Sequence, residues 1–238
     1  MKLTSRRLVV MFGTAAVLLL CQCVGFAQGA AGSKLEEIEW TWEVRPAHAD
    51  AKLPNVLLLG DSITRAYFPE VTRQLTGVAN VYLMASSTSV GDPRLARQIE
   101  EFSSAEGVSF SLVHFNNGMH GWAYTESEYR EAFAAFLAEI RTIAPKAELI
   151  WATTTPVKKD TEKDAPVPGP TNARVEARNA IAAELVKLAG IAIDDQHGLM
   201  LKHTELHQDN VHFSEEGAAI EGKQAAELIR ERLAVTKK

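Results

Sequence analysis

Cysteine is almost absent from this chain. Its two cysteines, Cys21 and Cys23, both lie within the first 27 of the 238 residues. If that segment is removed, the remaining chain has no thiol, which excludes disulfide bonds, thiolate nucleophiles and cysteine-ligated zinc. The fold must then depend on its hydrophobic core, and residues 28–238 are enough for one α/β domain.

Positive charge is also scarce. The chain has 25 Lys and Arg residues against 30 Asp and Glu residues, a formal net charge of −5, which becomes −8 when Lys2, Arg6 and Arg7 are removed with the first segment. An acidic chain without basic clusters is a poor partner for nucleic acid or anionic lipid. We therefore expect neutral or weakly charged small molecules or glycans as partners, and no nucleic acid.

The first 27 residues have the pattern of an export signal. Basic residues precede an apolar run over residues 8–26, and Gly25 and Ala27 are small residues at the two positions that signal peptidase reads. We expect cleavage after Ala27 and a secreted or periplasmic mature chain with no integral membrane domain. An uncleaved single-pass anchor is the alternative, because residues 8–20 are strongly apolar.

Short apolar runs alternate with helical patterns from residue 54 onward. Short strands separated by helices of a dozen residues or more indicate parallel strands joined by crossovers. We therefore predict a three-layer α/β/α sandwich with a mostly parallel, flavodoxin-like five-stranded sheet, preceded by an acidic and aromatic lead-in over residues 28–53. The predicted strands are Val56–Leu59, Val81–Met84, Phe110–Phe115, Leu149–Ala152 and Ile191–Ile193.

Three segments between or after these runs have the apolar spacing of one helix face. The first is preceded by a capping box, Thr125 to Glu128, and the second ends at Gly190. The apolar positions of the three faces are Tyr129, Phe133, Phe136 and Ile140, then Ile181, Leu185 and Leu188, and finally Ala225, Leu228 and Ile229.

Two short motifs near opposite ends of the chain supply a serine, a histidine and an acid. Gly60-Asp61-Ser62 follows the first apolar run, and Asp209-Asn210-Val211-His212 precedes the last helix. A serine hydroxyl needs a base within hydrogen-bond reach and a third group that orients the base. Ser62 is therefore the candidate nucleophile, His212 the candidate base and Asp209 the candidate orienting acid.

Each of these residues also has a structural interpretation. Ser62 would serve as a helix N-cap, Asp209 as a turn residue and His212 as a partly buried histidine. The order and combination of the motifs favour catalysis, because ligands on open parallel sheets bind at the carboxyl ends of the strands, where both motifs would meet. Asp61 is expected to brace the turn and Gly60 to permit a tight bend.

The two motifs resemble those of the SGNH, or GDSL-type, hydrolases, whose first block is Gly-Asp-Ser after the first strand and whose last block is Asp-x-x-His. The resemblance covers the chain from about residue 54 and implies a hydrolase domain over residues 54–238. It implies a serine esterase that forms an acyl-enzyme without a cofactor, acting on a small ester or an O-acetylated glycan. A lysophospholipase or thioesterase on the same fold, or a non-catalytic glycan-binding module, are the alternatives.

The segments that would form the oxyanion hole depart from the family pattern. In the family, a backbone glycine of a second block and an asparagine of a Gly-x-Asn-Asp third block join the N–H of the nucleophile. If Gly118 matches the third-block glycine, His120 stands where the asparagine would be; a shifted spacing would instead keep Asn117. In the second block, residues 85–92, Gly91 is the candidate backbone donor, and any of the serines of this block is an alternative. The backbone N–H of Ser62 completes the set.

No metal site is expected. His203 and His207 are four residues apart, but no glutamate stands beside His203 in the zincin arrangement, so we interpret both as surface or structural histidines. Asp194 and Asp195 follow a strand and receive no role. Residues 158–170, rich in charge, proline and glycine, are interpreted as a solvated surface loop rather than an active-site loop.

Overall fold

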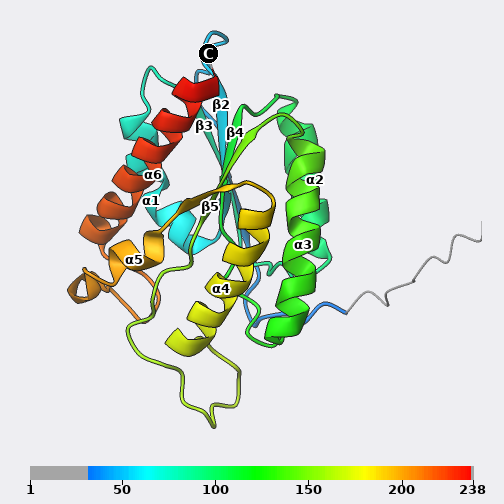
Figure 1. The fold of residues 1–238 in the computed structure, drawn as a ribbon, viewed down its shortest axis with the longest axis vertical. Coiled ribbons are helices and arrows are strands. Elements are labelled where there is room, and N and C mark those ends of the chain that lie inside the picture. Colours follow the sequence, from blue (N-terminus) through cyan, green and yellow to red (C-terminus); the bar gives the residue numbers. More distant parts are fainter. Residues whose placement is uncertain (1–31, 237–238) are drawn as a thin grey trace, which may run out of the picture. The chain divides into compact units, whose positions relative to one another are not determined.

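The computed structural model describes residues 32–236, in which strands and helices alternate (Figure 1). The strands are β1 (Thr41–Val44), β2 (Asn55–Gly60), β3 (Asn80–Ser86), β4 (Leu112–Phe115), β5 (Glu148–Ala152) and β6 (Ala192–Asp194). The helices are α1 (Ser62–Gln74), α2 (Arg94–Glu106), α3 (Glu126–Ile143), α4 (Asn172–Leu188), α5 (Gln196–Met200) and α6 (Glu215–Thr236), with one 3-10 turn, η1 (Thr204–Leu206).

The predicted export signal over residues 1–27 lies outside the described residues. Within residues 32–236, none of the helices combines the length and the apolar character needed to cross a membrane.

The strands form one sheet in the order β1-β3-β2-β4-β5-β6. Strands β2 to β6 run parallel to one another, which confirms the predicted mostly parallel sheet. Within this parallel set the first strand in the chain occupies the second position, as in flavodoxin-like sheets. The five predicted strands are therefore present, in the predicted parallel arrangement.

The sheet has one strand more than the sequence predicts. β1 pairs antiparallel with the outer edge of β3, with Thr41 opposite Ser86 and Val44 opposite Leu83. Three of its four side chains are exposed and Val44 is half-buried. This edge strand therefore lacks the apolar run from which a strand is predicted. The lead-in segment thus contributes a strand to the sheet.

The core lies on both faces of the sheet. In β2, Leu57 and Leu59 pack in one apolar cluster with residues of α2, α3 and α4, whereas Val56 and Leu58 pack in a second cluster with residues of α1 and α6. Successive side chains of a strand point to opposite faces, so a strand covered on both sides reads as a continuous apolar run. Figure 1 shows these two helical layers on either side of the sheet.

The helix that follows the capping box matches its sequence pattern. In α3 the Thr125 side chain accepts the Glu128 N–H while the Glu128 side chain accepts the Thr125 N–H. Its buried residues are the four predicted ones, Tyr129, Phe133, Phe136 and Ile140. In α6, Ala225 and Ile229 are buried as predicted and Leu228 packs partly buried against the core.

The predicted face of α4 is wrong at its end. Leu188 is 80% exposed, and Ile181 and Leu185 are only partly buried. The residues that face the core are Val175, Arg178, Ala182 and Val186. The apolar stripe therefore contains an arginine, which the search for apolar spacing could not include, and Leu188 lies in the last turn beyond that stripe.

Candidate active site

Ser62 is the first residue of α1, and only Asp61 separates it from the end of β2. The N-cap of the helix is Asp61, whose Oδ1 accepts the Ile63 N–H at 3.0 Å. The interpretation of Ser62 as an N-cap is therefore wrong, and the bracing role predicted for Asp61 is confirmed. Capping by Asp61 leaves the Ser62 hydroxyl available to a partner outside the helix.

Gly60 is required by close packing rather than by an unusual backbone angle. A Cβ atom at this position would lie 2.7 Å from Cβ of Thr64, one turn into α1, and among the described glycines Gly60 is not one of those with positive φ. Any larger residue would push α1 away from β2 and displace Ser62.

Ser62, His212 and Asp209 form a hydrogen-bonded chain. His212 Nε2 lies 2.7 Å from Ser62 Oγ, and His212 Nδ1 lies 2.9 Å from Asp209 Oδ2. The histidine and the acid come from the loop between η1 and α6, and the serine comes from the turn between β2 and α1. The sequence motifs are thus brought together at the carboxyl edge of the sheet.

The Asp209 carboxylate is held in its charged form. Its Oδ1 accepts the backbone N–H groups of Val211 at 2.8 Å and His212 at 2.7 Å. Burial alone would raise its pKa, but these bonds and the His212 side chain outweigh burial and lower the pKa of Asp209 to about 2. A carboxylate only accepts hydrogen bonds, so His212 carries its proton on Nδ1 and its neutral Nε2 can accept the Ser62 proton.

A cleft of about 460 Å³ opens beside this chain of residues. Ser62 and His212 line it, and its other walls come from residues 34–37, 119–123 and 167–170 together with Val211. Most of the wall is apolar, from side chains such as Met119, Trp122 and Val167. The interpretation of residues 158–170 as a surface loop therefore fails for its last four residues, which border the cleft.

The two predicted third-block donors face different surroundings. Asn117 is buried, and its side chain spans to the loop after β3, where Oδ1 accepts the Val90 N–H and Nδ2 donates to the Thr88 carbonyl, both at 3.0 Å. His120 lines the cleft together with Ser62. Asn117 thus holds two loops together, and of the two candidates only His120 faces the cleft.

The second-block candidate, Gly91, is not among the residues that line the cleft. Its N–H donates to Ser89 Oγ at 3.3 Å, and a Cβ atom at Gly91 would lie 2.8 Å from the ring of Tyr124. Gly91 therefore packs closely against Tyr124, and its role as a backbone donor stays a prediction.

Arg178, which no sequence motif marks, organises the loop that carries His120. The side chain is buried in α4 and donates to the carbonyl groups of His120 and Gly121, both at 2.8 Å. Its guanidinium lies 4.1 Å from the ring centroid of Trp122. Burial lowers the pKa of Arg178 to about 10, so the group stays charged at neutral pH and fixes the loop after β4.

The segment before β1 borders the same loop. Lys34 donates its backbone N–H to the Tyr124 hydroxyl at 2.8 Å. Glu36 Oε2 lies 2.8 Å from His120 Nδ1, and Glu36 Oε1 accepts the Gly121 N–H at 2.8 Å. No motif marks Glu36 in the sequence, because it lies in the segment interpreted as a lead-in outside the hydrolase domain.

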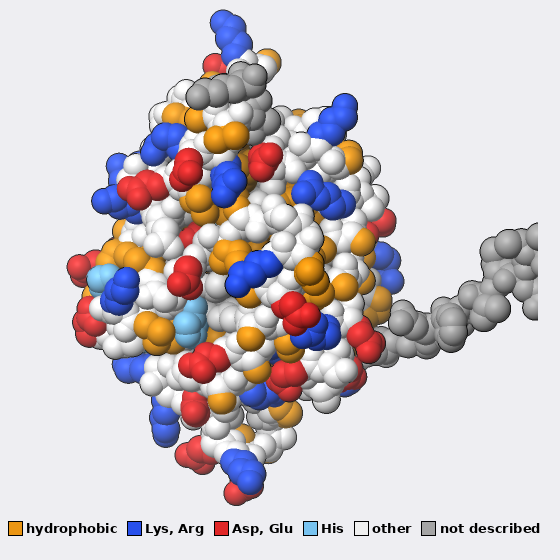
Figure 2. Space-filling view, in the orientation of Figure 1, with side chains coloured by type: hydrophobic (Ala, Val, Ile, Leu, Met, Phe, Trp, Pro, Cys, Tyr) orange, Lys and Arg blue, Asp and Glu red, His pale blue; other side chains and the backbone are white. Residues whose placement is uncertain are grey.

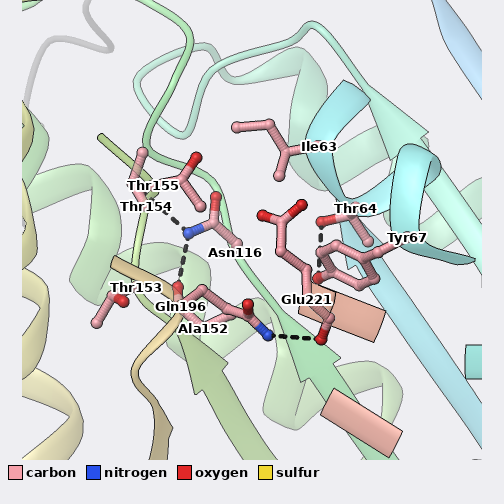
Figure 3. A pocket seen from close by; sticks show the side chains of 10 residues that line it. All are labelled: Ile63, Thr64, Tyr67, Asn116, Ala152, Thr153, Thr154, Thr155, Gln196 and Glu221. Carbon is pink, nitrogen blue, oxygen red and sulfur yellow. Dashed lines mark hydrogen bonds between the residues drawn. The ribbon is translucent and has the colours of Figure 1, made fainter. Parts of the chain in front are cut away.

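A small cavity of about 10 Å³, lined largely by polar residues, lies beside the first turn of α1. Figure 3 shows the side chains of Thr64, Asn116 and Glu221 directed into it. Burial, followed by the nearby charges of Asp61 and Asp194, raises the pKa of Glu221 to about 8, so Glu221 is protonated at neutral pH. A space of this size holds about one water molecule.

Asp194, Asp195 and His207 have structural contacts. Asp194 pairs with His114 inside the core, Asp195 caps α5, and His207 packs its ring on Phe213 with a centroid distance of 4.0 Å. Within residues 32–236, no group of three or more His, Cys, Asp or Glu side chains is arranged to hold a metal ion. Figure 2 shows acidic and basic side chains interspersed on one face of the molecule.

Comparisons with known proteins relate this arrangement to one family. Residues 58–220 match the GDSL-like Lipase/Acylhydrolase family. No curated protein matches the chain. Three similar solved structures differ strongly in sequence but share the fold.

The first is a GDSL-like lipase from Bacteroides thetaiotaomicron, with 15% identity, a TM-score of 0.58 and coverage of 79% of this chain and 93% of the other. The second is a variant of an acetyl-xylooligosaccharide esterase from Geobacillus, with 17% identity, a TM-score of 0.57 and coverage of 73% and 93%. The third is a lipase/acylhydrolase from Enterococcus faecalis, with 18% identity, a TM-score of 0.57 and coverage of 76% and 97%.

Proposed function

Because the chain belongs to the GDSL-like lipase/acylhydrolase family, we propose that it is a serine esterase that uses Ser62, His212 and Asp209. The observation that carries this proposal is the chain of two hydrogen bonds, 2.7 and 2.9 Å long, that joins the three side chains beside a cleft. A protein kept only for glycan binding would not need this arrangement.

The proposed reaction proceeds through an acyl-enzyme. His212 Nε2 takes the proton of Ser62 as Oγ attacks the ester carbonyl carbon, and Asp209 stabilises the resulting imidazolium. The tetrahedral intermediate collapses when its bond to the alkoxy oxygen breaks and His212 donates its proton to the leaving alcohol. Water then attacks the acyl-enzyme by the same steps and releases the carboxylic acid and free Ser62.

The negative oxygen of the tetrahedral intermediate needs hydrogen-bond donors at the cleft. The backbone N–H of Ser62 is one candidate, because it lies at the start of α1, where helix N–H groups have no partner within the helix. A second donor would come from the loop after β4, which reaches the cleft through His120.

We infer that the substrate is an ester with a short acyl group, such as an O-acetylated carbohydrate. The largely apolar wall of the cleft suits an acyl group, and one structural relative is an acetyl-xylooligosaccharide esterase. A series of p-nitrophenyl esters from acetate to decanoate tests this. We expect kcat/KM to be highest for acetate or butyrate, whereas a maximum at decanoate would support the lysophospholipase or thioesterase alternative.

A serine-directed fluorophosphonate probe together with the Ser62→Ala variant tests the proposed function. We expect the purified protein to be labelled at Ser62 and to hydrolyse p-nitrophenyl acetate, with turnover reduced by about 10⁴-fold or more in Ser62→Ala. Wild-type turnover in Ser62→Ala would overturn the proposal. Glu43→Gln, on the exposed edge strand β1, is a matched control that should behave as the wild type.

We also propose that the chain acts outside the cytoplasm after cleavage following Ala27. The support is the basic and apolar pattern of residues 1–27. N-terminal sequencing of protein recovered from the medium or periplasm should begin at Gln28. Recovery of the full-length chain from membranes would support an anchor instead.

A further inference from the structure

The two ring nitrogens of His120 have unequal surroundings. Nδ1 lies 2.8 Å from a Glu36 carboxylate oxygen. Nε2 is buried and has no hydrogen-bond partner in the structure, although the residue lines the cleft that contains Ser62. Buried polar atoms of side chains are normally paired, so an unpaired nitrogen on a residue that lines the same cleft as Ser62 indicates a group whose partner arrives with the substrate.

The charge of the ring decides what Nε2 can do. A carboxylate only accepts hydrogen bonds, so the contact with Glu36 places a proton on Nδ1. In a neutral ring Nε2 would then carry a lone pair and would repel an oxyanion. Only the imidazolium, which carries a proton on each nitrogen, can donate from Nε2 while it stays bound to Glu36.

The surroundings of His120 favour that charged form. Burial of the ring opposes protonation, but the hydrogen bond to Glu36 and the charges of Asp61, Glu36 and Glu39 outweigh burial and raise the pKa of His120. Burial would raise the pKa of Glu36, but its interactions with His120 and the Gly121 N–H outweigh burial and lower that pKa. The charged and titratable groups around the ring are Glu36 and Glu39 before β1, Asp61 before α1, Arg178 on α4 and His212 across the cleft.

We propose that His120 acts as a cationic oxyanion donor through Nε2–H, and that Glu36 is the positioning residue that fixes the orientation and charge of its ring. This inference rests on the proposed esterase function. Glu36 holds the loop at two points, His120 Nδ1 and the Gly121 N–H. It lies outside residues 58–220, which match the family, so the segment before the matched region completes the site.

A histidinium differs from the family's asparagine in one measurable way, because it can lose its proton. The base His212 must be neutral, so activity falls at acidic pH, and the donor His120 must be charged, so activity falls at alkaline pH. The expected kcat/KM profile is therefore bell-shaped, and the alkaline limb belongs to the His120–Glu36 pair. An asparagine amide does not titrate and would produce no such limb.

The experiment compares pH profiles of p-nitrophenyl acetate hydrolysis between pH 5 and about 9.5, corrected for spontaneous hydrolysis. In Glu36→Gln we expect the alkaline limb to move toward lower pH by about one unit and kcat to fall about 10-fold with KM within twofold. In His120→Asn, which restores a neutral donor, we expect the alkaline limb to disappear. Glu36→Gln added to His120→Asn should then leave the alkaline side unchanged, and Glu43→Gln should match the wild type.

A readout independent of turnover accompanies the kinetics. Imidazole ¹⁵N chemical shifts of His120, recorded in the inactive Ser62→Ala protein, should report a charged ring at pH 7 that becomes neutral at lower pH in the Glu36→Gln background. Melting temperatures of all variants identify any that fail to fold.

The possible outcomes separate the two proposals. A working serine esterase whose alkaline limb is the same in Glu36→Gln and persists in folded His120→Asn overturns this inference alone, as does a neutral His120 ring at pH 7. Absence of any Ser62-dependent turnover overturns the proposed function and this inference with it.

Discussion

Two carboxylate–histidine pairs in this protein have nearly the same length and opposite surroundings. Asp209 and His212 lie 2.9 Å apart with side chains 54% and 37% exposed, whereas Asp194 and His114 lie 2.8 Å apart and are completely buried. In the exposed pair the second ring nitrogen meets Ser62 Oγ at the cleft. In the buried pair it lies 3.5 Å from the Tyr67 hydroxyl, inside the protein.

The comparison shows that surroundings, rather than the pair itself, decide between chemistry and support. Asp194 also accepts from Gln196 at 2.9 Å and from Gln224 at 2.7 Å, so both of its oxygens take part in linking β4, β6, α5 and α6. Such a network stabilises one arrangement of the core, and removal of one member leaves a buried charge unpaired. The exposed pair leaves one nitrogen free for a reacting proton.

Removal of the exposed histidine should have the largest effect on activity. His212→Ala deletes the base, and we expect kcat to fall by about 10³-fold or more with a nearly unchanged melting temperature, because the ring is partly solvated. Steady-state kinetics and thermal unfolding of the same preparation measure both. A large loss of stability in His212→Ala would remove the distinction between the two pairs.

The acid of the exposed pair should matter somewhat less. In Asp209→Asn the amide no longer fixes the proton on Nδ1, and we expect kcat to fall by about 10²- to 10³-fold. In the wild type, Asp209 has its pKa lowered to about 2, so it stays charged at pH 4 and above, and its contribution to stability is complete above its unfolded pKa of about 3.9 and is lost as the pH falls from there through about 2. The acidic limb of the activity profile should therefore follow His212, which a profile flat to pH 4 would contradict.

Removal of the buried histidine should lower stability and leave activity nearly unchanged. His114→Ala leaves Asp194 without its cationic or donor partner in the core, and we expect the free energy of unfolding to fall by about 3 kcal/mol. At a temperature where the variant is folded, kcat should stay within about threefold of the wild type, which is under 1 kcal/mol of activation free energy. Urea denaturation and kinetics at 15 °C test the two expectations, and a loss of kcat in the folded variant would assign His114 to the chemistry.

The smallest expected effect concerns Glu221, a buried carboxyl group that is not paired with a histidine. The pKa of Glu221 is raised to about 8, so between its unfolded pKa of about 4.3 and pH 8 the folded state keeps a proton that the unfolded state has lost, and stability falls as the pH rises through this range. Glu221→Gln should remove this dependence and be the more stable protein at pH 8, by roughly 1–3 kcal/mol. Melting temperatures at pH 5 and pH 8 test it; equal pH slopes in both proteins would contradict the buried, protonated state.

The exposed pair could be predicted from the sequence and the buried pair could not. Asp209 and His212 are three residues apart and follow a recognisable order with Ser62, whereas His114 and Asp194 are eighty residues apart and meet only through strand pairing. The parallel strands were visible as apolar runs because both of their faces are buried. The edge strand β1 has no such run, because its side chains are mostly exposed. The burial of Arg178 is hidden in the sequence because a charged residue interrupts the apolar stripe of α4.

The residues of the oxyanion region could be predicted from the sequence only in part. Spacing alone left Asn117 and His120 as equal candidates, and the choice depends on a contact with Glu36, 84 residues earlier in the chain. Gly91 looked like a backbone donor because it is the single glycine of its block, but its lack of a side chain is used against Tyr124. A glycine required by packing and one required by chemistry look alike in a single sequence.

The position of β1 affects how the protein can be shortened. A chain trimmed to start at residue 54 would keep Ser62, Asp209 and His212, but would lose the strand that covers the outer edge of β3. All seven residues of β3 are buried in the intact protein. Without β1, the outer edge of β3 would expose a row of unpaired backbone N–H and C=O groups, which readily pairs with another chain. Such a trimmed protein should self-associate. A loss of activity caused by this association would then be misinterpreted as the choice of a wrong test substrate.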